Sequence, residues 1–563
     1  MLYLIYTVRL LVRWIRNLLK RLRRAPEYVV FTLEGPYPEM VPPRPPFPRR
    51  LLSPKTPSLR DLAKQLRYVA EDRRVKGVVL RLCDVGAATA TLQSLRDLIA
   101  ELRGAGKRVV VWSHSYDMAR YYVACTADEI LLQHVGDVTA TGARRGFVFV
   151  ADALEWIGLQ AEVVQISPYK TAGDMLTRRE MSDEARKMAN WLIDDTYEQY
   201  IEGIASGRSI AADEAKALID GGPYPGDAAV EVGAIDGLIG EEDLPVHLGT
   251  GKKPARLASY GVAKKKLLLP PLRRPGKAIA LLRIAGDIID GRSAVPPVRP
   301  PFRVPLLFSE RAGDLTVVQQ ARSLARNKRI GAVVVHVDSG GGSATSSEAM
   351  AAALREVAKK KPVVVSMGAV AASGGYYVAT PGQRLFAQPG TITGSIGVLS
   401  GKIVNAGLYE KLLWHREVIS RGEHAEMMST SRSFTEEERQ GLWDRINRIY
   451  DVFLDRVMTS RDMTRDAVDA IGGGRVWTGR QALEHGLVDE LGGLDRAIAV
   501  AREMAGLHRR CRTFEVKTPK KDLAPVGAQA ASGLLAYAAD GLRHLRSTQV
   551  LYICPLVLSE EDF

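Results

Sequence analysis

Ser373 is the residue of this sequence best placed to act as a nucleophile. It stands in AASGGYY, between a β-branched run and the helical pattern of Tyr376, Tyr377 and Val378. A serine in the first turn of a helix lies near free backbone N–H groups, which stabilise the oxyanion formed when a hydroxyl attacks a carbonyl. An N-cap serine in a tight packing turn has the same surroundings, so this segment alone leaves both interpretations open.

A glycine-rich loop, DSGGGS over 338–343, follows the strand that precedes the Ser373 strand. In a parallel sheet this loop emerges at the same edge as Ser373. Its glycines permit the close backbone approach and the unusual dihedral angles that a main-chain oxyanion hole needs. An ordinary glycine-rich turn is the alternative.

No histidine is evidently placed to activate this serine. His415 and His424 are the first histidines after Ser373, and neither stands in a motif-like setting. An amine that has lost its proton through burial can act as the base instead. Lys170 in SPYKTAGD is a lone lysine in a neutral, small-residue stretch, although most lysines of this kind simply reach solvent.

The elements that must position these residues recur in two halves, at an offset of about 253 residues. Expected strands are YVVFTLEG (28–35), GVVLRLC and KRVVVWS in the first half, and IALLRIAG (279–286), AVVVHVD and KPVVVSM in the second. Helical patterns separate them, and the acidic segments SDEAR and TEEER begin matching helices at Ser182 and Thr435. The alternation predicts an α/β fold of two tandem repeats with mainly parallel sheets.

The composition is typical of a globular protein, with 46% hydrophobic and 25% charged residues. The net charge of +14 is concentrated in two stretches without acidic residues, 1–24 and 244–286. Because the folded bodies are not basic, we do not expect nucleic-acid binding. The four cysteines are widely separated and the nine histidines do not cluster, which predicts neither a disulfide framework nor a metal site.

Residues 1–24 are predicted to form an amphipathic arm. Arg9, Arg13, Arg16 and Lys20 recur at helical spacing, and leucines and Trp14 populate the remainder of the helix. The charges interrupt the apolar run before the roughly 20 residues that a membrane span needs. The pattern favours a helix that lies in an anionic membrane surface, and packing on the protein itself is the alternative.

Several separated motifs give the chain a resemblance to the long, duplicated form of the signal peptide peptidase A (protease IV) family. They are SPYKTAGDMLTRREMSDEAR, VVSMGAVAASGGYYVAT, PGTITGSIGV and GRVWTGRQALEHGLVDELGG, within roughly residues 28 to 507. The resemblance implies two tandem Clp protease/crotonase-like repeats and a serine peptidase with a Ser/Lys dyad that requires no metal or organic cofactor. It also implies homo-oligomers associated with the bacterial cytoplasmic membrane, which cleave peptides such as released signal peptides.

The resemblance assigns roles to individual residues. Ser373 matches the nucleophile, Lys170 in YKTA matches the general base, and Ser395 in TGSIG matches the serine that orients the lysine. When Tyr121-Tyr122-Val123-Ala124 is aligned with Tyr376-Tyr377-Val378-Ala379, Met118 stands where the later copy has Ser373. At the repeat offset, Lys170 pairs with about Glu423. Each half alone therefore lacks one member of the dyad, and the site must form where the two halves pack together.

Gly374 and Gly341 match the pair that forms the family's oxyanion hole. The family's usual Ser-Pro-Gly-Gly loop is Ser-Gly-Gly-Gly here, over 339–342. The extra glycine leaves Gly341 and Gly342 as alternatives for one of the two N–H donors.

The expected organisation has five parts. They are the arm (1–24), an N-terminal repeat that supplies the lysine (28–243), a basic linker (244–276), a C-terminal repeat that supplies the serine (277–511), and a C-terminal tail without an assigned role (512–563). Two other functions remain open at this point. The chain is then either a catalytically silent membrane scaffold, as the degenerate first half suggests, or an acyl-CoA enzyme of the crotonase type, which shares the fold and the oxyanion hole.

Overall fold

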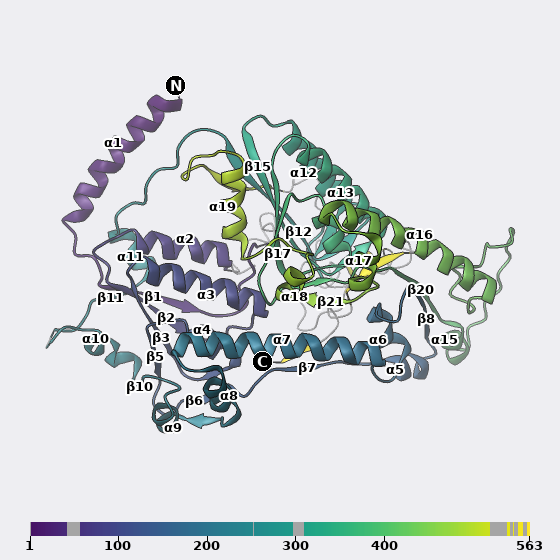
Figure 1. Cartoon of the computed structure of the whole chain (residues 1–563), viewed down its shortest axis with the longest axis horizontal. Helices are drawn as coiled ribbons and strands as arrows, with labels where there is room; N and C mark the ends of the chain where they lie inside the picture. Colours follow the sequence, from purple (N-terminus) through teal and green to yellow (C-terminus); the bar gives the residue numbers. More distant parts are fainter. Residues whose placement is uncertain are drawn as a thin grey trace.

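The computed structural model describes residues 2–41, 57–251, 253–296, 309–517, 537–540, 544, 550–554 and 560–562. Two α/β halves lie side by side, with the first half in purple and blue and the second in teal and green (Figure 1). Mainly parallel sheets and packing helices occur in both halves, as the sequence pattern predicts.

The first half is built on a parallel sheet of order β10-β5-β3-β2-β1-β11. Its strands are β1 (Tyr28–Leu33), β2 (Gly77–Leu82), β3 (Arg108–Ser113), β5 (Glu129–Leu132), β10 (Gly237–Leu238) and β11 (Leu257–Ser259). A small sheet beside it contains β4 (Tyr116–Asp117), β6 (Asp137–Thr139) and β9 (Tyr224–Pro225).

The second half is built on a sheet of order β21-β19-β17-β15-β12-β23. Its strands are β12 (Ala278–Ala285), β15 (Ile330–Ser339), β17 (Val363–Ala372), β19 (Ile392–Gly394), β21 (Val476–Thr478) and β23 (Thr513–Glu515), with β18 (Arg384–Ala387) and β22 (Glu490–Leu491) beside β17. The central strands are rich in valine and alanine and are buried along most of their length, because helices cover both faces of the sheet.

A third sheet joins the two halves. Its order is β14-β13-β16-β24-β20-β8, with β8 (Gln160–Gln165), β13 (Asp287–Ile289), β14 (Arg311–Gly313), β16 (Gly341–Ser343), β20 (Leu399–Val404) and β24 (Leu551–Ile553). Strand β8 comes from the first half, β24 comes from the C-terminal tail, and the others come from the second half. A separate two-stranded pair joins β7 (Arg144–Gly146) to β25 (Glu560–Asp562).

Helices connect and cover the strands in both halves. Those of the first half and its N-terminal arm are α1 (Leu2–Arg21), α2 (Leu59–Ala70), α3 (Thr89–Gly104), α4 (Met118–Ala124), α5 (Ala151–Trp156), α6 (Asp174–Thr177), α7 (Asp183–Arg208), α8 (Ala212–Asp220), α9 (Gly226–Glu231), α10 (Leu244–His247) and α11 (Tyr260–Lys266). Those of the second half are α12 (Asp314–Arg326), α13 (Ala344–Ala358), α14 (Gly374–Ala379), α15 (Ala406–Lys411), α16 (Glu436–Arg461), α17 (Arg465–Ile471), α18 (Gly479–Glu484) and α19 (Leu494–Met504).

The two longest helices begin at the N-caps that the sequence indicates. The Ser182 hydroxyl accepts a hydrogen bond from the Ala185 N–H at the start of α7. Thr435 and Glu438 form a capping box at the start of α16. Both helices have 26 residues, and each occupies the same place in its repeat.

The basic stretch after residue 243 is not a bare linker. It contains α10, β11 and α11, and β11 extends the first sheet by pairing in parallel with β1. Strand β11 has the sequence LAS, which contains no long apolar run that would predict a strand. It is extended because its backbone pairs with the edge of β1. Residues up to Lys266 therefore pack with the first repeat, and the connection proper begins after them.

The N-terminal arm is helical over Leu2–Arg21, and Figure 1 shows α1 projecting away from the body. The C-terminal part of α1 contacts the body, where Lys20 donates to the Leu267 carbonyl and Asn17 exchanges hydrogen bonds with Leu269. Among the helices of the described chain, none is long and apolar enough to cross a membrane.

Candidate active site

Ser373 lies at the turn from β17 into α14, as the sequence predicts. Its φ of 55° falls in the left-handed region, which is uncommon for a residue with a side chain, and its N–H donates to the Gly394 carbonyl at 2.8 Å. The turn is tight because Gly375 packs against Ser339, the last residue of β15. A Cβ at Gly375 would lie 2.2 Å from the Ser339 carbonyl oxygen, so a side chain there is excluded.

Lys170 reaches the second half because β8 leaves the first repeat and pairs with β20. Six antiparallel residue pairs join the two strands, from Gln160 with Val404 to Gln165 with Leu399. The Ile166 N–H continues the pairing by donating to Val398 at 3.2 Å. The ladder therefore brings the loop that carries Lys170 against the segment that carries Ser395.

The Lys170 side chain makes three short contacts. Its Nζ lies 2.8 Å from Ser373 Oγ, 2.9 Å from Ser395 Oγ and 3.0 Å from the Ser395 carbonyl oxygen. A neutral amine has two N–H bonds and one lone pair. It can therefore donate to both oxygens of Ser395 and accept the proton of Ser373, which is the arrangement that a general base requires.

Burial lowers the pKa of Lys170 to about 7, and the nearby Cys554 thiol opposes this shift. Lys170, Ser373 and Ser395 are all completely buried. Removing an ammonium group from water favours the neutral form because the protein does not replace the lost hydration. Near neutral pH a substantial fraction of the amine is therefore free to accept a proton.

Two glycines make room for the lysine, and neither was identified from the sequence as part of the site. A Cβ at Gly474 would lie 2.6 Å from the Lys170 Cα, and a Cβ at Gly397 would lie 3.2 Å from the Lys170 Cδ. The Gly474 φ of 95° also requires glycine. The run Gly472-Gly473-Gly474 could have indicated a close approach of two backbones. That Lys170 is the residue it approaches is known only from the tertiary structure.

The two candidate oxyanion donors lie on the loops beside Ser373. Gly374 is the first residue of α14, where the backbone N–H has no acceptor within the helix. The Gly341 N–H donates to Ser339 Oγ at 3.2 Å, a long contact that a substrate oxygen can replace. Both glycines belong to ladders of the third sheet, with Gly341 opposite Ile553 and Gly342 opposite Tyr552 and Ile288. Gly341 and Gly342 therefore both remain candidates for the second donor.

The positions matched to the dyad in the other repeat carry no equivalent chemistry. Met118 is the buried first residue of α4, in the place that Ser373 has before α14. Glu423 is exposed on the segment between α15 and α16. A second dyad is therefore not formed from these positions.

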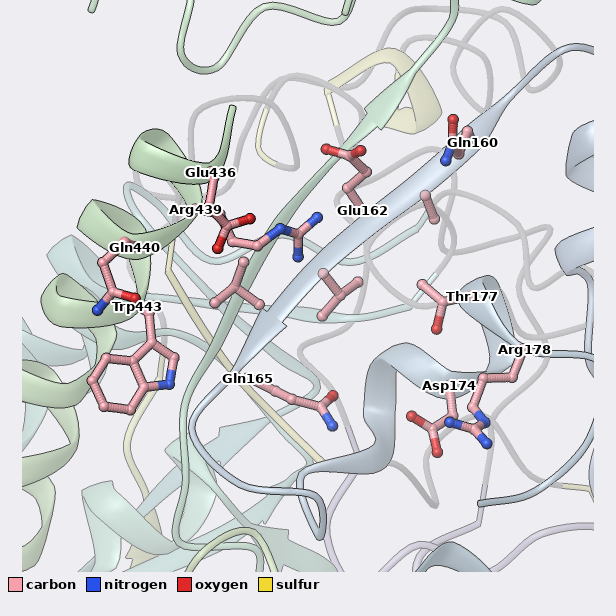
Figure 2. A pocket seen from close by; sticks show the side chains of 13 residues that line it. Gln160, Glu162, Gln165, Asp174, Thr177, Arg178, Glu436, Arg439, Gln440 and Trp443 are labelled. Atoms are coloured by element: carbon pink, nitrogen blue, oxygen red, sulfur yellow. The ribbon is translucent and has the colours of Figure 1, made fainter. Parts of the chain in front are cut away.

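A cleft of about 860 Å³ lies beside β8, away from the dyad. Figure 2 shows that its side chains come from β8, α6 and the start of α16, among them Glu162, Arg178 and Trp443. Ser373 and Lys170 are not in its lining. Because both dyad side chains are completely buried, a substrate carbonyl reaches Ser373 only after part of the cover moves.

Comparison with known proteins gives the same two-repeat organisation. The family model for peptidase family S49 matches the chain twice, over residues 101–253 and 355–508. The chain is 29% identical over 492 residues to "Serine protease SPPA, chloroplastic" of Arabidopsis thaliana, covering 85% of this chain and 70% of that protein. It is 30% identical over 464 residues to "Protease 4" of Salmonella typhi, covering 80% of this chain and 72% of that protein.

Among solved structures, the chain is similar to a mutant of the 1510-N membrane-bound stomatin-specific protease in complex with a substrate peptide. The similarity covers 44% of this chain and 96% of that chain, with 12% sequence identity and a TM-score of 0.27.

Proposed function

This chain belongs to peptidase family S49, and from that premise we propose that it is a membrane-associated serine endopeptidase with a Ser373/Lys170 dyad. The observation that carries the proposal is the 2.8 Å contact between Lys170 Nζ and Ser373 Oγ in a fully buried site. A silent scaffold does not require a neutral amine hydrogen-bonded to a serine hydroxyl, and neither does a crotonase-type acyl-CoA enzyme.

The first half of the reaction forms an acyl-enzyme. Neutral Lys170 takes the proton from the Ser373 hydroxyl while Oγ attacks the peptide carbonyl carbon. Backbone N–H groups of Gly374 and of Gly341 or Gly342 stabilise the oxyanion of the tetrahedral intermediate. The Lys170 ammonium then gives its proton to the leaving amine, the C–N bond breaks, and the acyl group remains on Ser373 as an ester.

The second half of the reaction returns the enzyme to its starting state. Lys170, neutral again, takes a proton from water while the water oxygen attacks the ester carbonyl. The second tetrahedral intermediate releases the carboxylate product, and Ser373 regains its proton from Lys170. Ser395 keeps the amine pointed at Ser373 throughout, because its hydroxyl and carbonyl oxygens are both acceptors for Nζ.

Membrane association is proposed through α1. Apolar side chains of this helix are exposed, with Trp14 at 64% and Leu11 at 60%. Basic side chains share the same helix, and none of its residues is acidic. This combination supports a helix in the anionic surface of a bacterial cytoplasmic membrane, close to signal-peptide-like substrates. The homo-oligomer implied by the family resemblance stays a prediction.

The experiment that tests the enzymatic proposal is labelling with a fluorophosphonate, which phosphonylates activated serines. We expect one adduct per chain, mapped to Ser373 by peptide mass spectrometry. The Ser373→Ala and Lys170→Ala variants should not be labelled. Labelling at another serine, or equal labelling of Lys170→Ala, would contradict the dyad.

A further inference from the structure

The sheet of the second half has a strongly basic edge on the side opposite Ser373. Strands β17, β15, β12 and β23 are parallel neighbours, so all four begin at this edge. Lys277 directly precedes β12, Arg329 precedes β15 and Arg512 precedes β23. Three lysines at 359–361 stand just before β17, whose other end leads into Ser373. The parallel arrangement therefore gathers cations at one edge and the dyad at the other.

The connection between the repeats and the segment after α19 enlarge this edge. The Arg274 N–H donates to the Arg510 carbonyl at 3.0 Å, and the Arg273 side chain donates to the Thr513 carbonyl at 3.3 Å. We call the exposed cations gathered here the basic edge. Its members are Arg273, Arg274, Lys277, Lys328, Arg329, Lys360, Arg509, Arg510 and Arg512.

The charge of the basic edge has little compensation within the protein. Its residues belong to four segments that contain no acidic residue, namely 256–286, 326–331, 358–362 and 505–513. Within the described chain, none of the nine side chains forms a salt bridge. Glu71 faces Arg510 and offsets only part of the charge. Cations from different segments are close together, since partial burial and then the ammonium groups of Lys277 and Lys360 lower the pKa of Lys361. Like charges at this density repel one another, so an anionic partner that covers them is stabilising.

The basic edge is continuous with the root of α1. Lys20 donates to the Leu267 carbonyl at 2.6 Å, and Arg74 donates to the Lys20 and Lys266 carbonyls at 2.9 and 3.0 Å. These bonds join α1 to α11, which lies near the lower end of α1 in Figure 1 and leads through a short connection into Arg273. A membrane surface that holds α1 is therefore brought next to the basic edge.

We propose that the basic edge binds anionic phospholipid headgroups and is a second membrane contact, which sets the orientation of the body. This inference rests on the membrane association proposed through α1 and does not depend on the dyad. Lysine and arginine at a membrane surface attract the headgroup phosphates, and neighbouring cations add to one another. Nucleic acid carries the same phosphate chemistry, but it offers no apolar phase for the exposed Trp14 and Leu11 of α1. The charge and the adjoining apolar helix together favour lipid.

The proposed orientation determines where the dyad lies relative to the membrane. Strand β17 begins at the basic edge, has ten residues and ends next to Ser373. A strand rises about 3.3 Å per residue, so β17 spans about 33 Å. A contact through the basic edge holds the dyad at this order of distance from the headgroups. The substrate class that follows is peptides that have already left the lipid, rather than segments still inserted in it.

The first test measures binding of the full-length protein to phosphatidylglycerol vesicles by sedimentation at about 0.1 M salt, where charges interact over about 10 Å. The edge variant combines Lys277→Glu, Arg329→Glu and Lys360→Glu. The control variant changes the net charge equally at exposed positions of α7, α8 and α16, and combines Lys187→Glu, Lys216→Glu and Arg448→Glu. We expect the edge variant to bind at least about tenfold more weakly and the control variant to lose less than about threefold. Equal losses in the two variants, or an unchanged edge variant, would overturn the inference.

A second measurement needs no variant. Lysines of the full-length wild type are acetylated with a water-soluble acetyl ester, and mass spectrometry compares the free protein with the vesicle-bound protein. We expect the vesicles to protect Lys277, Lys328 and Lys360 and to leave the control lysines of α7 and α8 unchanged. Equal acetylation of both groups would overturn the inference, and so would protection by a short DNA duplex without protection by vesicles. Failure of α1 as the membrane arm is recognised separately, because Trp14→Ala then binds vesicles as the wild type does while the edge lysines stay protected.

Discussion

Lys170 Nζ and Ser373 Oγ lie 2.8 Å apart although the two residues are separated by 203 positions and belong to different repeats. The antiparallel pairing of β8 with β20 creates this contact. Because the first repeat lacks the serine and the second lacks the lysine, the proposed dyad requires the packing of the two halves.

The first prediction concerns Gly474, whose backbone touches that of Lys170. Gly474→Ala places a Cβ 2.6 Å from the Lys170 Cα, which pushes the amine away from Ser373. We expect kcat to fall about 100-fold, the order of loss for a misplacement near 1 Å. Gly486→Ala is the control, because its φ of 70° imposes similar strain with no atom within 4 Å of the new Cβ. Equal kcat losses in the two variants would show that strain, not contact with Lys170, is responsible.

The second prediction concerns Arg480 in α18, which joins the repeats. It contacts Asp195 at 2.6 Å, Glu202 at 2.7 Å and Glu198 at 3.1 Å, all on α7. Arg480→Ala leaves the buried Asp195 carboxylate without this partner, and we expect a loss of about 1–3 kcal/mol in the free energy of unfolding.

The control for Arg480 is an exposed ion pair within the first repeat. Arg179 contacts Asp152 at 2.5 Å, but its side chain is 74% exposed. Arg179→Ala should leave the free energy of unfolding unchanged within the error of the measurement, because the pair is exposed to solvent. Urea titrations measure both effects. A similar small change for Arg480→Ala would mean that this network does not hold the halves together.

The third prediction concerns the membrane arm. Trp14→Ala should weaken binding to phosphatidylglycerol vesicles in a sedimentation assay, while Trp156→Ala should not, although Trp156 is 78% exposed. Replacing Arg9, Arg13 and Arg16 by glutamine should weaken binding by up to about 100-fold, because each cation contributes about 1 kcal/mol near an anionic surface. Undiminished binding in both the Trp14 and arginine variants would assign membrane attachment to another surface.

The fourth prediction uses the shifted pKa of Lys170 as a probe of stability. Folding lowers this pKa from 10.5 to about 7, so between these values the unfolded chain holds a proton that the folded chain has lost. The stability of the wild type relative to Lys170→Met should therefore rise with pH across this window, by up to about 1.4 kcal/mol per pH unit. Denaturant unfolding of both proteins at pH 7 and pH 9 measures the difference. A constant difference would contradict a buried, neutral amine.

The sequence was informative where local pattern determines local structure. The β-branched runs of β15 and β17 and the N-caps at Ser182 and Thr435 predicted their elements correctly. The two-repeat α/β organisation and the family were also predicted correctly. Each of these features is encoded in one continuous stretch of sequence, so it can be recognised without knowing which segments meet in the folded protein.

Other features depend on which segments meet in space. The contact of Gly474 with Lys170 joins residues from different repeats, and neither sequence neighbourhood reveals the other. Strand β11 exists beside an open edge of β1 within a stretch whose charge suggested a linker. Strand β24 has no counterpart in the first half, so the repeat pattern gave no reason to expect it in the third sheet.

The most direct test of the central claim is the pH dependence of fluorophosphonate labelling at Ser373. The labelling rate of the wild type should rise as Lys170 loses its proton, with a midpoint near pH 7 set by the lowered pKa of that amine. Lys170→Arg should not be labelled at any pH up to 9, because guanidinium stays protonated. A wild-type rate that is flat from pH 5 to 9, or labelling of Lys170→Arg at the wild-type rate, would contradict a serine activated by Lys170.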